Sequence, residues 1–350
     1  MKTICVDASK KYDVLVGSGL LRSLGEYAAS TILPGKAAII SDTNVWPLYG
    51  PMAEASLRDA GFDTVTYLFP AGEASKNTET YVHVLNFLAE NRLTRADCII
   101  ALGGGVVGDL AGFAAATYLR GIAYIQVPTT LLAMVDSSIG GKTAVDLPAG
   151  KNLAGAFYQP SIVICDTNAL HTLPEDILRD GCAEVIKYAV LYDAQLFSHL
   201  LNNGMAFDKE AVISRCVELK RDVIMLDEFD TGARMMLNFG HTIGHGIEAQ
   251  SHYCVSHGKA VAIGMAIVSK AANSYKLCTD EAYVCIMQLL NVFQLPSCTS
   301  FSAQQIYTGA LSDKKRTGSN VNLIIPRQIG KCEIYPTPLD QLLPFIEAGL

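Results

Sequence analysis

Histidines and glycines gathered in one short segment are the residues of this sequence best suited to bind a metal ion. Residues 238–248 contain His241 and His245, four positions apart, so on a helix both side chains would lie on one face. A third histidine, His257, opens another apolar helical stretch, and Glu184 lies within a third. Imidazoles and a carboxylate from several helices are what a catalytic zinc ion binds while keeping one position open. The spacing alone does not say which two histidines would be ligands.

A pair of histidines at this spacing is often only packed or solvated, and the glycines argue against that interpretation. Positions 240, 244 and 246 are all glycine, and each costs about 1 kcal/mol relative to alanine inside a helix. Their presence favours the close approach of another group. The segment is not the H-E-x-x-H motif of zinc proteases, because Thr242 follows the first histidine.

A glycine-rich loop at residues 103–109 predicts a site for a dinucleotide. It contains G-x-G-x-x-G, follows an expected strand and opens an expected helix. Glycines let the backbone approach a pyrophosphate, and a helix N-terminus favours its negative charge. The loop lies about 100 residues into the chain, and no acidic residue follows at the usual spacing. From this pattern alone, a tight strand-to-helix turn without a ligand explains the glycines as well as a dinucleotide site does.

Basic side chains predict an anionic substrate. Residues 140–143 resemble the end of a P-loop, but Asp136 stands where that motif requires glycine, so we reject a P-loop. Lysine still suits phosphate as a point charge, although a single lysine is more often a solvated surface residue. Lys187 is the exception, since it lies three positions after Glu184 on an apolar helix. The basic candidates are Arg120, Lys142, Lys151, Lys187, Lys220, Arg234 and residues 314–316.

The composition limits the class of protein. The 350 residues are 50% hydrophobic and 17% charged, which is enough to build a sizeable core. The formal charge of −7 argues against broad nucleic-acid binding. The 10 cysteines are scattered without C-x-x-C, as is typical of reduced cytosolic thiols. We expect no signal peptide and no membrane-spanning segment, and therefore a cytoplasmic protein.

Alternating patterns predict two domains of different kinds. Residues 1–167 are expected to form an α/β domain with a Rossmann-like parallel sheet, and residues 168–350 a mostly α-helical domain. Strands are expected at 12–17, 36–42, 64–69, 98–102 and 123–128, with helices near 45–60, 77–92 and 107–119. Helical periodicity then covers 175–204, 209–227, 233–250, 257–277 and 280–293, and short strands return at 321–325 and 332–335.

These motifs together closely resemble the 3-dehydroquinate synthase family. Their order and spacing agree over almost the whole chain, at residues 41–44, 70–76, 103–112, 118–121, 128–133, 135–143, 150–152, 183–188 and 238–248. One departure lies at residues 180–183, where the family more often has a small residue before the glycine and an apolar residue after it. Glu184 and Lys187 match the family despite it.

The resemblance implies a carbon–oxygen lyase of the shikimate pathway, which leads to chorismate and the aromatic amino acids. Such an enzyme converts 3-deoxy-D-arabino-heptulosonate 7-phosphate to 3-dehydroquinate and phosphate. Transient oxidation by NAD, phosphate elimination, reduction and intramolecular aldol closure follow one another. The implied cofactors are NAD and a divalent metal, zinc or cobalt. The implied state is a cytoplasmic homodimer whose partner is a small-molecule substrate, with no nucleic acid and no membrane.

The resemblance also implies roles for individual residues. The metal ligands are Glu184, His241 and His257, and His245 then belongs to the substrate pocket. The NAD-binding positions are Asp42, Asn44, Glu73, Lys76, Gly104, Gly105, Val106, Asp109, Thr129, Thr130, Asp136, Lys142, Lys151 and Thr172. The substrate-binding positions are Arg120, Asp136, Lys142, Lys151, Asn152, Lys187, Lys220, Arg234, Asn238, His245 and one of Lys314 and Lys315. The catalytic positions are His245, Lys142, Lys187, Asn152 and Glu184.

Three alternatives remain open at this stage. A cyclase acting on another sugar phosphate would share the metal and NAD sites. A metal-dependent polyol dehydrogenase would form net NADH and has less use for Lys142, Lys151 and Asn152. A non-catalytic NAD-binding relative would have lost a ligand or base, whereas the candidate residues of the metal site and its neighbouring base are all present.

Overall fold

The computed structural model describes residues 1–311 and 320–350 and separates into two compact units. The first unit comprises Met1–Pro174 and Lys209–Phe229, and the second comprises Glu175–Asp208 and Asp230–Leu350. The division expected after residue 167 differs from these units mainly at helix α7 (Lys209–Leu226), which folds with the first unit. Helical periodicity predicts which face of a helix is buried, but it does not say against which unit. Within the described ranges, no helix combines the length and apolar character needed to cross a membrane.

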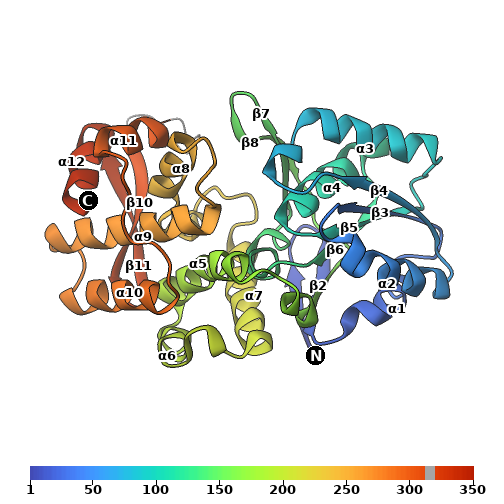
Figure 1. Cartoon of the computed structure of the whole chain (residues 1–350), viewed down its shortest axis with the longest axis horizontal. Coiled ribbons are helices and arrows are strands. Elements are labelled where there is room, and N and C mark those ends of the chain that lie inside the picture. The colour runs from blue at the N-terminus through green and yellow to red at the C-terminus, as the bar shows by residue number, and fades with distance from the viewer. Residues whose placement is uncertain (312–319) are drawn as a thin grey trace. The chain divides into compact units, whose positions relative to one another are not determined.

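A seven-stranded sheet organises the first unit (Figure 1). Its strand order is β1-β2-β9-β6-β5-β3-β4, in which only the β1–β2 pair is antiparallel. The strands are β1 (Lys2–Asp7), β2 (Lys11–Gly17), β3 (Lys36–Asp42), β4 (Asp63–Phe69), β5 (Cys98–Gly103), β6 (Ala123–Pro128) and β9 (Ile162–Asp166). The expected strands at 36–42 and 123–128 match β3 and β6 residue for residue, so the predicted parallel α/β sheet is confirmed.

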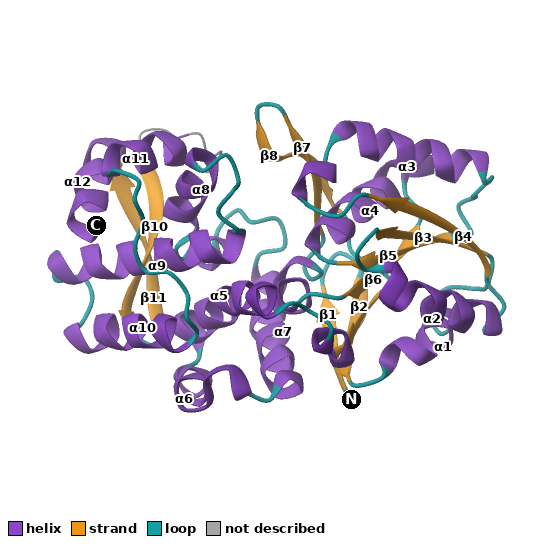
Figure 2. Cartoon of the chain, viewed as in Figure 1, coloured by secondary structure: helices purple, strands orange, loops and turns teal. Residues whose placement is uncertain are grey.

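Both faces of this sheet are covered, as Figure 2 shows. Neighbouring strand residues point to opposite sides, so Ile39 and Ile40 enter two different hydrophobic clusters. One cluster includes Leu24 and Leu57 from two helices, and the other includes Leu110. The covering helices are α1 (Leu24–Ala29) and α2 (Trp46–Asp59) on one face, and α3 (Thr78–Glu90) and α4 (Gly105–Thr117) on the other. Strands buried on both sides explain the continuous apolar runs of the sequence.

Two further elements complete the first unit. Strands β7 (Lys142–Leu147) and β8 (Gly150–Phe157) form a separate antiparallel hairpin that contacts α4. Helix α7 packs against β1 and β2, where Lys2 forms an ion pair with Glu218.

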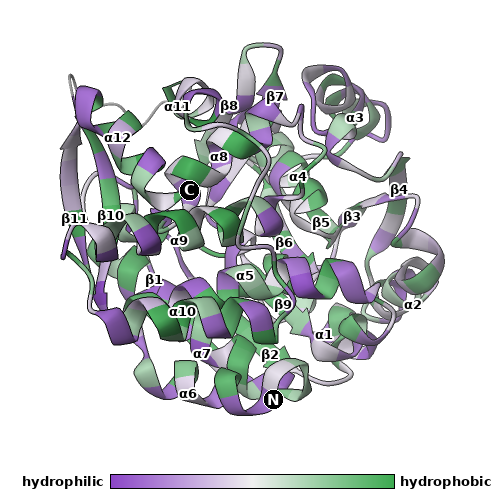
Figure 3. Ribbon diagram, turned by 60° about the vertical axis from the view of Figure 1, so that its left-hand side comes forward, coloured by the Kyte–Doolittle hydropathy of each residue, from purple (hydrophilic) through white to green (hydrophobic). Residues whose placement is uncertain are grey.

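Helices dominate the second unit, as expected from the periodicity, and several of them pack around α9 (His257–Ser274). Hydrophobic residues colour large parts of α9 and α10 green in Figure 3, and most of the central residues of α9 are buried. The remaining elements are α5 (Glu175–Tyr192), α6 (Ala194–Asn203), α8 (His241–Gln250), α10 (Asp280–Val292), α11 (Ala303–Leu311), α12 (Leu339–Gly349) and the hairpin β10 (Asn320–Gln328) and β11 (Lys331–Pro338). Helices α5, α8 and α9 bring the candidate metal ligands of this unit together.

Candidate active site

Most of the predicted NAD-binding residues follow the carboxyl ends of parallel strands in the first unit. Those ends meet at one edge of the sheet, where open α/β sheets bind ligands. The residues concerned are Asp42 at the end of β3 and Asn44 after it, Glu73 and Lys76 after β4, Gly104 to Val106 after β5, Thr129 and Thr130 after β6, and Thr172 after β9. Positions far apart in the sequence are therefore collected along one edge by the sheet topology.

The glycine loop connects β5 to α4 and has the features of an anion site. Gly104 is the N-cap of α4 and provides no side-chain hydrogen bond, so the first backbone amides of the helix have no side-chain acceptor there. A Cβ atom on Gly104 would lie 3.1 Å from Thr130, and one on Gly105 would lie 3.1 Å from Ser137. The loop is thus packed closely without side chains of its own, and these residues fit the phosphates of a dinucleotide.

A buried ion pair lies beside this loop. Lys76 is almost fully buried, and its Nζ atom lies 2.7 Å from Asp109 on α4. Burial alone would lower the pKa of Lys76, but the charges of Asp109 and Glu73 outweigh it and raise that pKa above its usual value of 10.5. Lys151 forms a second ion pair with Glu73 at 3.2 Å. Glu73, which is predicted to bind NAD, is therefore in contact with Lys151, which is also predicted to bind the substrate.

The predicted substrate-binding residues of the first unit occupy three different places. Lys142, Lys151 and Asn152 lie on the β7–β8 hairpin. Lys220 of α7 is buried and forms an ion pair with Asp136, whose carbonyl oxygen also accepts a hydrogen bond from Lys220. Arg120 belongs to the short 3₁₀ helix Tyr118–Arg120, which follows the C-terminal end of α4.

Arg120 is exposed after the C-terminal end of α4 and has a positive φ of 67°. The glycine loop lies at the other end of this 13-residue helix, roughly 20 Å away at 1.5 Å per residue. The carboxyl edge of the sheet and Arg120 are therefore separated by the length of α4.

In the second unit, Glu184, His241 and His257 converge around one point. The Nε2 atoms of His241 and His257 lie 3.4 Å and 3.5 Å from Oε1 of Glu184. The three ligand atoms all lie within 4.8 Å of one another, and Glu184 is fully buried. Neither of its oxygens accepts a well-formed hydrogen bond from the described residues. A buried carboxylate facing two imidazoles fits a divalent metal with an open position.

Both imidazoles are held from behind in the orientation that a metal requires. Nδ1 of His241 lies 3.1 Å from the carbonyl oxygen of Phe239, which can only accept, so Nδ1 carries the proton. Nδ1 of His257 lies 3.3 Å from the buried carboxylate of Glu248. These contacts leave Nε2 of each ring directed at Glu184, and such partners are usual behind metal-binding histidines.

The charges of this cluster also suit a metal ion. Burial would raise the pKa of Glu184, but the charge of Lys187 and the contact with His241 hold that pKa well below its usual 4.5. Burial, and then the charge of Lys187, lowers the pKa of His241 to about 4, so this imidazole is neutral near pH 7. Burial would lower the pKa of His257, but the carboxylates of Glu184 and Glu248 raise it to about 10. A metal would replace a proton on that ring.

The other predicted residues of the second unit lie on the same elements or directly before them. Lys187 of α5 is buried and forms an ion pair with Glu184. The ring centroid of His245 lies 5.5 Å from that of His241 and 6.2 Å from that of His257. Arg234, which is buried, and Asn238 belong to the short 3₁₀ helix Ala233–Asn238 that leads into α8. Lys314 and Lys315 lie outside the described residues.

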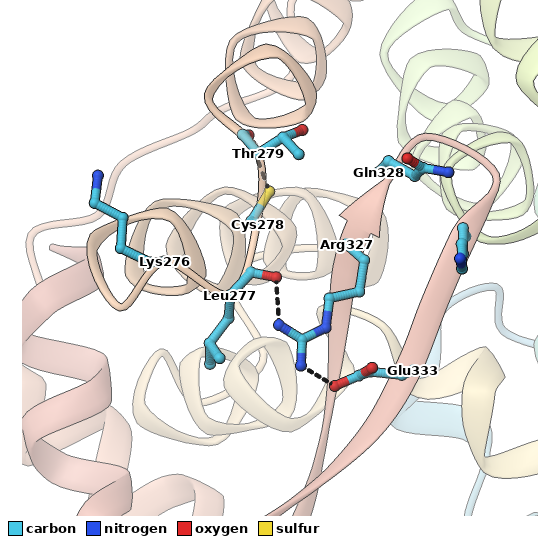
Figure 4. A pocket seen from close by; sticks show the side chains of 8 residues that line it. Lys276, Leu277, Cys278, Thr279, Arg327, Gln328 and Glu333 are labelled. Atoms are coloured by element: carbon cyan, nitrogen blue, oxygen red, sulfur yellow. Dashed lines mark hydrogen bonds and ion pairs between the residues drawn. The ribbon is translucent and has the colours of Figure 1, made fainter.

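A separate pocket of about 470 Å³ lies in the second unit (Figure 4). At its centre, Arg327 donates a 2.8 Å hydrogen bond to the carbonyl oxygen of Leu277 and forms an ion pair with Glu333. These contacts join the turn after α9 to the β10–β11 hairpin. The lining contains none of the predicted site residues, so we assign the arginine a structural role.

Comparisons with known proteins show the family to which this chain belongs. Family models for the N-terminal and C-terminal parts of 3-dehydroquinate synthase match residues 66–180 and 181–316. A 3-dehydroquinate synthase of Streptococcus suis (strain 05ZYH33) is 43% identical over 343 residues, which cover 96% of this chain and 97% of that protein. The chain belongs to the 3-dehydroquinate synthase family.

Solved structures of sugar-phosphate cyclases share the fold of this family member. A 2-deoxy-scyllo-inosose synthase, complexed with carbaglucose-6-phosphate, NAD⁺ and Co²⁺, is 26% identical with a TM-score of 0.89, and the match covers 100% of both chains. The 2-epi-5-epi-valiolone synthase ValA of Streptomyces hygroscopicus subsp. jinggangensis 5008, with NAD⁺ and Zn²⁺ bound, is 27% identical with a TM-score of 0.89. That match covers 100% of this chain and 98% of ValA.

Two carboxylates of this chain, which contact predicted site residues, were not predicted from the sequence. Glu248 contacts His257, and with His245 the two residues form a second group whose ligand atoms lie within 4.8 Å. Asp146 accepts a 2.8 Å hydrogen bond from the backbone amide of Asn152, which has a positive φ of 54°. The signal for Glu248 was its place one helical turn after His245, at i+3. The pairing of Asp146 with Asn152 depends on the turn of the β7–β8 hairpin.

Proposed function

We propose that this protein is a 3-dehydroquinate synthase that converts 3-deoxy-D-arabino-heptulosonate 7-phosphate to 3-dehydroquinate and phosphate in the shikimate pathway. The observation that carries this proposal is the buried group of Glu184, His241 and His257, in a chain 43% identical to a 3-dehydroquinate synthase over nearly its whole length. We further propose that it works as a cytoplasmic homodimer, as the family resemblance implies.

We propose that Glu184, His241 and His257 hold a divalent ion, zinc or cobalt, and that the residues along the carboxyl edge of the sheet hold NAD. When bound, NAD would accept and return a hydride, and the ion would act as a Lewis acid toward the oxidised hydroxyl. Support comes from the geometry of the three ligands and from the two cyclase structures, which contain NAD⁺ with Co²⁺ or Zn²⁺.

The chain's own residues would bind the anionic substrate and move its protons. Lys142, Lys151 and Asn152 on the β7–β8 hairpin are suited to the phosphate or carboxylate, since charge-assisted hydrogen bonds are the strong ones. Lys187, buried beside Glu184, would place a fixed positive charge next to the reacting oxygen. His245 flanks the ligand histidines and is the group suited to proton transfer near neutral pH.

A comparison of substrates tests the proposal. Purified protein with NAD and zinc or cobalt is incubated separately with the heptulosonate phosphate, sedoheptulose 7-phosphate and glucose 6-phosphate, and released phosphate is measured. We expect release only from the heptulosonate phosphate, without net NADH. Release only from another substrate would make the protein a different cyclase. Net NADH without phosphate would favour a polyol dehydrogenase.

A further inference from the structure

The N-terminus of α9 is capped by a residue from another helix. Ser256 is the N-cap of α9, yet its side chain makes no capping hydrogen bond to the helix. The carboxylate of Asp180 on α5 takes this place. Its Oδ1 atom accepts a 2.9 Å hydrogen bond from the amide of Lys259, and its Oδ2 atom accepts one of 3.1 Å from the amide of Gly258. The hydroxyl of Ser256 also donates to Asp180.

These amides are the second and third of the helix, which an N-cap side chain normally satisfies from the same helix. Here the acceptor comes from 78 residues earlier in the sequence. A carboxylate at this end also complements the positive end of the helix dipole. The cap therefore joins α5 to α9 as well as ending the helix.

Gly258 allows α9 to come into direct contact with α5 at Asp180. A Cβ atom on Gly258 would lie 1.9 Å from the carbonyl oxygen of Asp180 and 2.8 Å from its Cγ atom. No residue with a side chain fits there unless the helices separate. The first turn of α9 thus lies directly on the α5 backbone at Asp180.

This contact between α5 and α9 lies close in sequence to two of the proposed metal ligands, Glu184 and His257. Glu184 follows Asp180 by four positions, one turn along the same face of α5. His257 is the first residue of α9, directly before Gly258. The preceding residues 252–254 and 256 are exposed, so packing of that loop gives His257 little support. The cap at Asp180 ties the first turn of α9 to the helix that carries Glu184.

We propose that Asp180 is a positioning residue that holds His257 against Glu184 in the geometry that binds the metal ion. It acts through α9 and not as a ligand, since its oxygens already accept hydrogen bonds from Ser256, Gly258 and Lys259. The proposal rests on the proposed function, because it assumes that Glu184 and His257 bind a metal.

The test compares Asp180→Ala with a matched variant, Asp193→Ala. Asp193 also caps a helix of the second unit and accepts hydrogen bonds from two amides, those of Gln195 and Leu196 at the start of α6. It belongs to neither group of potential metal ligands in the described residues. Asp180→Asn is a third variant, which keeps one acceptor oxygen. Zinc affinity of the metal-free proteins is measured by competition with a chromophoric chelator, and Co²⁺ binding by its absorption spectrum.

We expect Asp180→Ala to lower zinc affinity by about 10- to 100-fold, the range for partners behind metal ligands, and to alter the Co²⁺ spectrum. Asp180→Asn should recover part of this loss. Asp193→Ala should lose a similar amount of thermal stability while its zinc affinity and Co²⁺ spectrum stay those of the wild type. Equal zinc affinities of Asp180→Ala and Asp193→Ala would overturn the proposal.

Amide hydrogen exchange of the metal-free proteins separates this proposal from the proposed function. Asp180→Ala should speed exchange at Gly258 and Lys259, whereas Asp193→Ala should not. Unchanged exchange at these amides would overturn the cap itself. A wild-type protein that binds no zinc would contradict both the proposed metal site and the positioning role, even if the exchange result confirmed the cap.

Discussion

The carboxylate of Glu248 lies 3.3 Å from Nδ1 of His257, and Glu184 lies 3.5 Å from Nε2 of the same ring. The imidazole is therefore held between two buried carboxylates, one on each nitrogen. If a metal takes the Glu184 side, Glu248 fixes the ring orientation and increases the electron density on Nε2.

This arrangement predicts that Glu248→Ala lowers zinc affinity by about 10- to 100-fold. Glu248→Gln should lose less, because its amide oxygen still accepts a hydrogen bond from Nδ1. Both are measured by chelator competition, with Glu281→Gln on the exposed start of α10 as the control. Wild-type affinity in Glu248→Ala would show that the contact does not support the metal.

Removal of His257 and removal of His245 should have different effects on metal content and turnover. We predict that His257→Ala is purified without metal, because Nε2 of His257 faces Glu184. His245→Ala should retain the metal but lose about 10²- to 10⁴-fold in kcat, the usual contribution of a general acid–base group. Metal content by mass spectrometry and turnover are measured together, with the exposed His199→Ala on α6 as the control. An empty metal site in His245→Ala would contradict the ligand assignment.

The ion pair between Lys76 and Asp109 should stabilise the first unit and its NAD site. Asp109→Asn leaves the buried ammonium of Lys76 without its nearest charge partner, which typically costs about 3 kcal/mol in the free energy of unfolding. The matched control is Glu54→Gln, which breaks the exposed Arg58–Glu54 pair and should cost less than about 1 kcal/mol. Urea denaturation and NAD titration measure both variants. Equal losses of stability would count against a special role for the buried pair.

The same pair predicts a pH dependence at the alkaline end. Because the folded protein raises the pKa of Lys76 above 10.5, this stabilisation is complete below pH 10.5 and is lost as the pH rises through the higher, folded value. The difference in unfolding free energy between wild type and Lys76→Met should therefore be constant from pH 8 to about 10 and then shrink. A difference that disappears already near pH 8 would contradict the direction of the shift.

Gly264 of α9 should be intolerant of any side chain. A Cβ atom there would lie 2.0 Å from the carbonyl oxygen of Gly240, the residue before His241. Gly264→Ala should push α8 away from α9, cost about 1–3 kcal/mol through overpacking and weaken zinc binding. Ser274→Ala, exposed at the end of the same helix, is the control in denaturation and zinc titration. Wild-type zinc affinity in Gly264→Ala would show that this contact does not position His241.

The sheet was largely predictable from sequence, since strands and helices alternate and the apolar runs at 36–42 and 123–128 became β3 and β6. The spacing of the histidines did not identify which of them bind the metal, because His241 and His245 share a helix face. The family resemblance proposed His241 and His257, whose Nε2 atoms both face Glu184.

Contacts between distant segments were not predictable in this way. The cap that Asp180 provides for α9 and the packing of α7 in the first unit depend on tertiary structure, which local periodicity does not contain.

The most direct test of the central claim is turnover with limiting NAD. Metal-loaded protein is mixed with excess 3-deoxy-D-arabino-heptulosonate 7-phosphate and a small, known amount of NAD, and phosphate, 3-dehydroquinate and NADH are followed together. We predict that phosphate and 3-dehydroquinate form in equal amounts, far exceeding the NAD added, with no net NADH. A reaction that stops after one NADH per NAD, without phosphate, would contradict the assignment as a 3-dehydroquinate synthase.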